Sequence, residues 1–172
     1  MAMKKTGARV ATNPTATTRA RAGTAKRATT FGAAVIGLLA SAVPVEAHTQ
    51  TGALGNGAEA TDYYQVFCSD DGTGAPGSLS VQISDQAPAA APLVSVQVRN
   101  GPDLATSTDP TDADGAASPL IHVNVRAGSV FDVLVDKTGA GSENYVLTFH
   151  CVTGPDGTGL HTGTDIVTRQ NQ

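Results

Sequence analysis

Short runs in which every second residue is apolar recur along the chain after residue 47. In Leu79–Ile83 and Val94–Val98 the positions between the apolar residues are Ser or Gln. This alternation places apolar side chains on one face of a β-strand and polar ones on the other. No window of ten or more residues after Ala47 has helical spacing. Strands are expected over residues 63–68, 79–83, 94–98, 121–125, 131–135 and 145–151, with a short seventh over 165–168.

Turn-forming Gly, Pro and Asp residues separate all of these runs. Short alternating strands at this spacing are typical of a sandwich or barrel, with one buried and one wet face per sheet. Residues 62–172 are therefore expected to form an all-β domain, an antiparallel β-sandwich of jelly-roll-like form with six to seven strands. Residues 48–61 are rich in Gly, Ala and Thr without an apolar period, and are expected to be a flexible arm.

The N-terminal segment has the composition of a secretory signal peptide. Seven of the eleven Lys and Arg residues precede residue 28, and an apolar stretch over 31–43 follows them. Its 13 residues suit the signal helix of an exported chain, whereas a membrane anchor needs about 20. Val45 and Ala47 provide the small residues expected before a cleavage site. Residues 1–47 are thus interpreted as a general secretory signal peptide, cut before His48 or alternatively after Ala42.

The remaining chain is strongly acidic. After Ala47 there are four basic and fourteen acidic residues, a net charge of −10. Nucleic acid and anionic membranes attract basic patches, so neither is expected as a partner. No second long apolar segment follows, so no integral membrane segment is expected after cleavage. A secreted or periplasmic location is expected.

The two cysteines, Cys68 and Cys151, both lie after the signal peptide. An even number of cysteines in an exported chain predicts a disulfide, since the compartment outside the cytosol is oxidising. Both residues continue the apolar face of an expected strand. The alternative, two buried free thiols, would suit a reducing cytosol.

The strand pattern from Ala60 to Cys151 resembles the bacterial pre-peptidase C-terminal domain, a small β-sandwich found on secreted hydrolases. The resemblance implies a fold and an extracellular setting, and it transfers no active site. This chain departs from the family in its Asp-rich insert over 103–119, in its cysteine pair and in having no catalytic domain. The segments that carry the resemblance are Asp62-x-Tyr64-x-Val66, Gly77-x-Leu79-x-Val81-x-Ile83, Gly128-x-Val130-Phe131-x-Val133-x-Val135 and Asn144-Tyr145-x-Leu147-x-Phe149.

Histidines give the first candidate metal site. Cleavage before His48 would leave its α-amine and imidazole as a bidentate chelate suited to Cu²⁺. His122 and His150 fall on the polar faces of expected strands and could complete the site. The alternative is that His48 begins a floppy arm and that the others, with His161, are ordinary exposed polar residues.

The acidic loop after residue 103 gives the second candidate. Asp109, Asp112 and Asp114 could contribute oxygen ligands to Ca²⁺. The spacing does not match an EF-hand, because Pro110 and Ile121 occupy two ligand positions. A solvated acidic loop is the favoured interpretation.

Catalytic motifs are missing from the sequence. Neither Gly-x-Ser-x-Gly nor His-Glu-x-x-His occurs, so no hydrolase is expected. The favoured hypothesis is an exported, non-enzymatic interaction module of the cell envelope or extracellular space, without a cofactor, binding a protein or polysaccharide. The alternative is a periplasmic copper-binding protein that uses His48. A third, weaker hypothesis is an accessory domain split from a secreted hydrolase.

Overall fold

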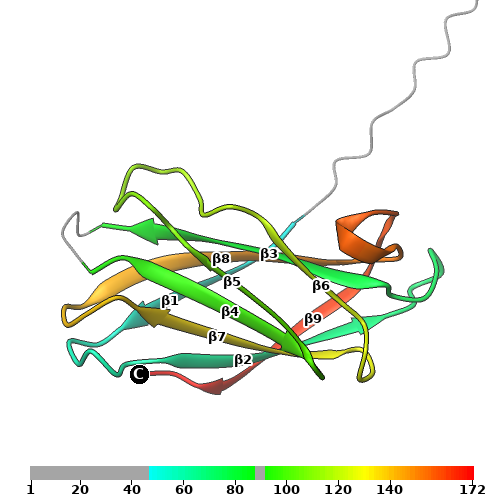
Figure 1. Ribbon diagram of the computed structural model, residues 1–172, viewed down its shortest axis with the longest axis horizontal. Coiled ribbons are helices and arrows are strands. Elements are labelled where there is room, and N and C mark those ends of the chain that lie inside the picture. Colours follow the sequence, from blue (N-terminus) through cyan, green and yellow to red (C-terminus); the bar gives the residue numbers. More distant parts are fainter. Residues whose placement is uncertain (1–46, 88–91) are drawn as a thin grey trace, which may run out of the picture. The chain divides into compact units, whose positions relative to one another are not determined.

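A computed structural model describes residues 47–87 and 92–172 of the chain. The expected signal helix lies outside these residues. The described part is an antiparallel all-β domain with one short 3₁₀ turn, η1 (Pro155–Gly157) (Figure 1). Its strands are β1 (His48–Leu54), β2 (Asp62–Ser69), β3 (Ser78–Gln86), β4 (Val94–Asn100), β5 (Asp103–Thr108), β6 (Ile121–Asn124), β7 (Val130–Lys137), β8 (Glu143–Val152) and β9 (His161–Gln170).

The strands form two layers that β9 joins. In one layer β8 pairs with β3 on one edge and with β1 on the other, and β6 pairs with β3. In the other layer the order is β5, β4, β7, β2, β9. The first two residues of β9 pair with β8 and the rest pair with β2, so the ladder passes from one layer to the other without a break.

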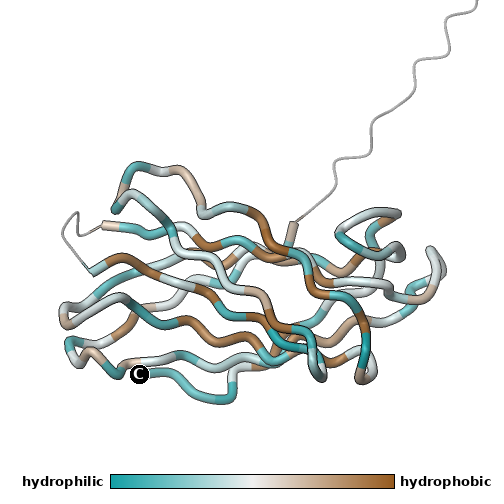
Figure 2. The backbone as a smooth tube through the Cα atoms, in the orientation of Figure 1, coloured by the Kyte–Doolittle hydropathy of each residue, from teal (hydrophilic) through white to brown (hydrophobic). Residues whose placement is uncertain are grey.

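The core lies between the two layers. Alternate residues of the strands are buried, as in β2 and β7, and Figure 2 shows hydrophobic positions along the strands with hydrophilic turns between them. This follows from the period of two that the sequence displays. The largest fully buried apolar side chains are Tyr64, Tyr145, Phe131, Phe149, Leu54, Leu79, Ile83 and Leu147.

The expectation of six to seven strands is wrong in number, because the described residues form nine. Residues 48–54, expected as part of a flexible arm, form β1 along one edge of β8. Residues 103–108, expected in a loop, form β5 against β4. Neither segment has strong alternation, and in both cases pairing with a neighbouring strand determines the structure.

Close packing explains the position of Gly52 in β1. Gly52 lies opposite Tyr145, and a Cβ at this position would come within 2.2 Å of the tyrosine ring. Only glycine leaves room for the ring at this point. Leu54, 1% exposed, then anchors the end of β1 in the core. The lack of apolar side chains that suggested an arm is therefore partly a consequence of this contact.

The predicted disulfide between Cys68 and Cys151 is confirmed, with Cα atoms 5.6 Å apart. Cys68 lies opposite Thr164 of β9, and Cys151 lies opposite Thr162. The bridge therefore joins β2 to β8 where β9 passes between the layers. It closes a sequence separation of 83 residues.

Removing this bridge should destabilise the domain. We expect the Cys68→Ala/Cys151→Ala double variant to lose about 2–5 kcal/mol of unfolding free energy, because the unfolded chain regains loop entropy. Denaturant unfolding with and without a reductant measures the loss. Two thiols that react with an alkylating agent in the native, unreduced protein would contradict the pairing.

Candidate metal centres

All four histidines of the chain lie towards the same end of the layer that contains β8. His150 lies in β8, and its partner across the ladder is Ser80 of β3, whose other partner is His122 of β6. On the opposite edge of β8, His161 pairs with Val152 and His48 pairs with Phe149. The imidazoles of His122, His150 and His161 therefore share the outer face of this layer. His48 lies at the edge, on the side of the buried Phe149.

The imidazoles are close to one another and to polar partners. The rings of His150 and His161 stack with centroids 4.3 Å apart and an interplanar angle of 15°. His122 Nδ1 lies 2.9 Å from Ser80 Oγ. The ring centroid of His48 lies 5.9 Å from that of Phe149, the residue that precedes His150 in the chain.

Proximity and burial favour the neutral form of two of these imidazoles. Burial lowers the pKa of His150, and the charges that His161, His122 and His48 would carry lower it further. Burial, followed by the charge of His48, lowers the pKa of His161. Neutral imidazoles offer a free lone pair near pH 7, which is the form that binds a metal.

One nitrogen in this group has an unusual environment. Nδ1 of His150 is buried and has no hydrogen-bond partner among the described residues. A buried polar atom without a partner is costly, and a bound ligand is one way to satisfy it. As placed, no three of the histidine nitrogens lie within 4.8 Å of one another. Chelation would therefore require side-chain movement. His48 is exposed at the edge of the layer, and it would have to turn around that edge from the side of Phe149.

A second group of potential ligands lies at the opposite end of β8. Asp85, Asp112 and Glu143 each place a carboxylate oxygen within 4.8 Å of the other two. Asp85 is 0% exposed and Glu143 2% exposed. Burial, with the nearby carboxylates, raises the pKa of Asp85 to about 6. Burial followed by the charges of Asp85 and Asp112 also raises the pKa of Glu143, which Lys137 partly offsets.

The candidate residues from the sequence are distributed unequally over these two groups. His48, His122 and His150 lie in the first, to which the structure adds His161. Of the three aspartates in the acidic loop, Asp112 enters the second group and Asp109 lies beside it. Asp109 accepts hydrogen bonds from the backbone N–H groups of Asp85 (2.8 Å) and Thr111 (3.2 Å).

The expectation that Asp114 shares a site with Asp109 and Asp112 finds no support in the geometry. Asp114 is exposed, and its Oδ1 accepts the backbone N–H of Ala116 at 2.7 Å. Asp85 and Glu143 are not among the candidates that the sequence suggests, although a signal was available. The alternation that buries Ile83 also buries Asp85, and the alternation that buries Tyr145 also buries Glu143.

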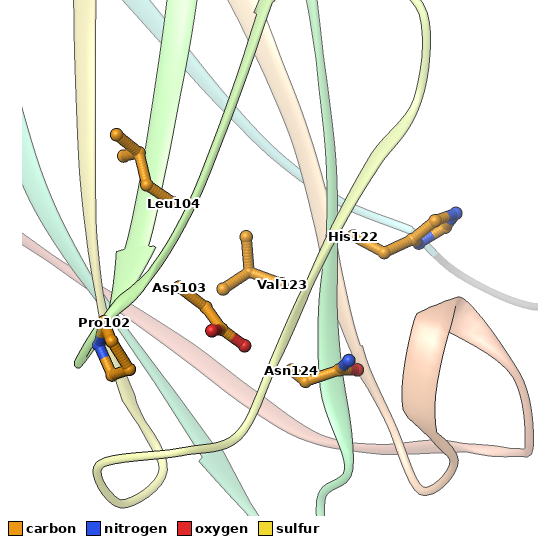
Figure 3. A pocket seen from close by; sticks show the side chains of 6 residues that line it. All are labelled: Pro102, Asp103, Leu104, His122, Val123 and Asn124. Carbon is orange, nitrogen blue, oxygen red and sulfur yellow. The ribbon is translucent and has the colours of Figure 1, made fainter.

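A hollow of about 350 Å³ lies between β5 and β6 and is lined by Pro102, Asp103, Leu104, His122, Val123 and Asn124. Figure 3 shows Asp103 and Val123 on one side of β6, whereas His122 points to the other side, towards η1. Asp103, the charged residue of the lining, is paired with Arg126 at 2.9 Å. The hollow therefore presents no free charged group to a ligand.

Comparisons with known proteins give no relative: no family model, curated protein or solved structure matches the chain. Within residues 47–87 and 92–172 we find no helix with the length and apolar character needed to cross a membrane.

The pKa values of the histidines can be tested on metal-free protein. We expect NMR titration to show that His150 and His161 both titrate below 6.5, the ordinary value for histidine. Replacing His161 by Gln should raise the pKa of His150, because a neighbouring positive charge is removed. A His150 pKa that is at or above 6.5, or that does not respond to His161→Gln, would contradict the described packing.

Proposed function

We propose that the chain is an exported, non-enzymatic copper-binding protein whose site is built on the mature N-terminus at His48. The observation that carries this proposal is a cluster of histidines from β6, β8 and β9 on one face of the layer, with the unpartnered Nδ1 of His150 among them and His48 at the start of the adjacent edge strand β1. The sequence alone favours a general interaction module and puts copper second. The convergence of the histidines reverses that order.

The position of β1 supports a site at the N-terminus. A chelate on a floppy arm would pay the entropy of ordering that arm on each binding event. Here His48 is the first residue of a strand whose seven residues all pair with β8, from Phe149 to Glu143. The strand holds His48 at the edge of β8, opposite Phe149 and within one residue of His150, so its nitrogens belong to a rigid element of the domain.

Ligand chemistry supports copper among the common metals. Cleavage before His48 creates a free α-amine on this residue. The α-amine and the imidazole of His48 then form a chelate of two nitrogens. Imidazoles of His150 and His161 can add further nitrogens. A site made only of nitrogen donors binds Cu²⁺ more strongly than the other divalent first-row metals. We assign no neighbouring residue the role of activating a substrate at this copper. Neither of the catalytic motifs sought in the sequence is present.

Export supports the same proposal. A signal peptide over residues 1–47 would generate the α-amine, and the Cys68–Cys151 disulfide suits an oxidising compartment. The proposed location is therefore secreted or periplasmic. The resemblance to the pre-peptidase C-terminal domain is compatible with this location and adds nothing to the metal site.

The test is calorimetric titration of Cu²⁺ into protein that begins at His48 and into protein with one glycine added before it. The extra residue moves the α-amine out of chelate range, so we expect the affinity to fall on the order of tens-fold or more. His150→Ala should also weaken binding. Thr51→Ala, an exposed change on β1, is the matched control and should leave the affinity unchanged.

Circular dichroism establishes that each variant is folded. Equal and weak Cu²⁺ binding by the protein with and without the added glycine would overturn the copper proposal. The exported interaction module would then remain as the better hypothesis.

A further inference from the structure

The acidic group at the start of β8 is a second, independent feature of the domain. Asp85 comes from the end of β3, Glu143 from the start of β8, and Asp112 from the loop that follows β5. These three residues are separated by up to 58 positions in the sequence, yet their carboxylate oxygens lie within 4.8 Å of one another. Like charges this close in a buried place repel strongly unless something offsets them.

Each of the three carboxylates has a buried oxygen without a hydrogen-bond partner among the described residues. These atoms are Oδ1 of Asp85, Oδ1 of Asp112 and Oε2 of Glu143. The second oxygen of Asp85 accepts the backbone N–H of Val94 at 3.0 Å, which fixes the orientation of the carboxylate. Three neighbouring carboxylates, each with an unpartnered buried acceptor, lack a donor or a cation.

The neighbouring lysine does not fill this role. Lys137 is only 7% exposed and lowers the pKa of Glu143, so its charge acts on the group. Its ammonium, however, donates to the carbonyl oxygens of Gly55 and Gly141. With Asp109 included, the group holds four acidic side chains against one lysine, and a divalent cation would reduce this excess.

The spacing suits calcium. Oxygen ligands lie about 2.3–2.6 Å from Ca²⁺, so two ligands on opposite sides of the ion are about 4.8 Å apart. All three carboxylate oxygens can therefore contact one ion. Ca²⁺ accepts six to eight oxygens in irregular geometry, which leaves room for bidentate carboxylates, carbonyl groups or water, whereas Mg²⁺ requires near-octahedral geometry.

We infer that Asp85, Asp112 and Glu143 form a Ca²⁺ site, and that Asp109 positions it. Asp109 lies outside the group of three carboxylates and positions it, because its Oδ2 accepts the backbone N–H of Asp85. Bound calcium ties the loop after β5 to the ends of β3 and β8. Glu143 and His150 are seven residues apart in β8, which corresponds to about 23 Å along the strand. The proposed calcium site is therefore independent of the proposed copper site.

The experiment measures thermal unfolding of EDTA-treated protein with the disulfide intact, with and without added Ca²⁺. A ligand that binds only the folded state raises the melting temperature, and a concentration of about 100 times Kd should raise it on the order of 10 °C. The same concentration of Mg²⁺ should give a clearly smaller shift. No shift with Ca²⁺, or an equal shift with Mg²⁺, would overturn the assignment.

Variants of two aspartates in one loop separate the site from general effects of charge. Asp112→Asn should lose most of the Ca²⁺-induced shift, and in EDTA it should melt no lower than the unmodified protein, because a repulsive charge is gone. Asp114→Asn is the matched control and should keep the full shift, since Asp114 lies outside the group. Equal loss in both variants would contradict the site.

Glu143→Gln gives a second comparison that does not depend on the loop. Direct calorimetric titration of Ca²⁺ should show binding to the unmodified protein and to Asp114→Asn, with at least tenfold weaker binding to Glu143→Gln. Unchanged affinity in Glu143→Gln would remove this residue from the site and overturn the inference as stated.

Discussion

Pairing of β8 along both of its edges is the interaction on which the rest of the structure depends. One edge carries β3 along nearly its full length, and the other carries β1 and then the start of β9. The disulfide at Cys151 connects the same strand to β2 in the other layer. Because β8 is held on both edges and across the layers, it provides a rigid base for the side chains at its two ends.

The sequence predicts the parts of the fold that depend on alternation. The strands now seen as β2, β3, β4, β6, β7 and β8, the middle of β9 and the disulfide follow from apolar periodicity and the cysteine pair. It does not predict β1 and β5, because these strands bury few apolar side chains and exist through backbone pairing with a neighbour. Gly52 illustrates why alternation fails to predict β1. This residue weakens the strand pattern in the sequence, but it makes room for the ring of Tyr145.

The sequence predicts the two candidate sites to different degrees, because contacts between distant strands cannot be read from alternation. Sequence analysis identifies His48, His122 and His150 from their chemistry, but only the register of β8 and β9 brings His161 against His150. The acidic loop draws attention to Asp112, whereas Asp85 and Glu143 lie within strands. Their burial is implied by alternation, and their convergence with Asp112 depends on how the loop after β5 folds back over the end of β3.

The central claim is that nitrogen donors of His48, including its α-amine, bind copper together with imidazoles of neighbouring strands. Pulsed electron paramagnetic resonance of Cu²⁺-loaded mature protein, with and without ¹⁵N-labelled histidine, tests it most directly. We expect an amine nitrogen and at least two imidazoles bound to the metal, with the amine signal lost when a residue precedes His48. A single imidazole, or a spectrum that the added residue leaves unchanged, would contradict it.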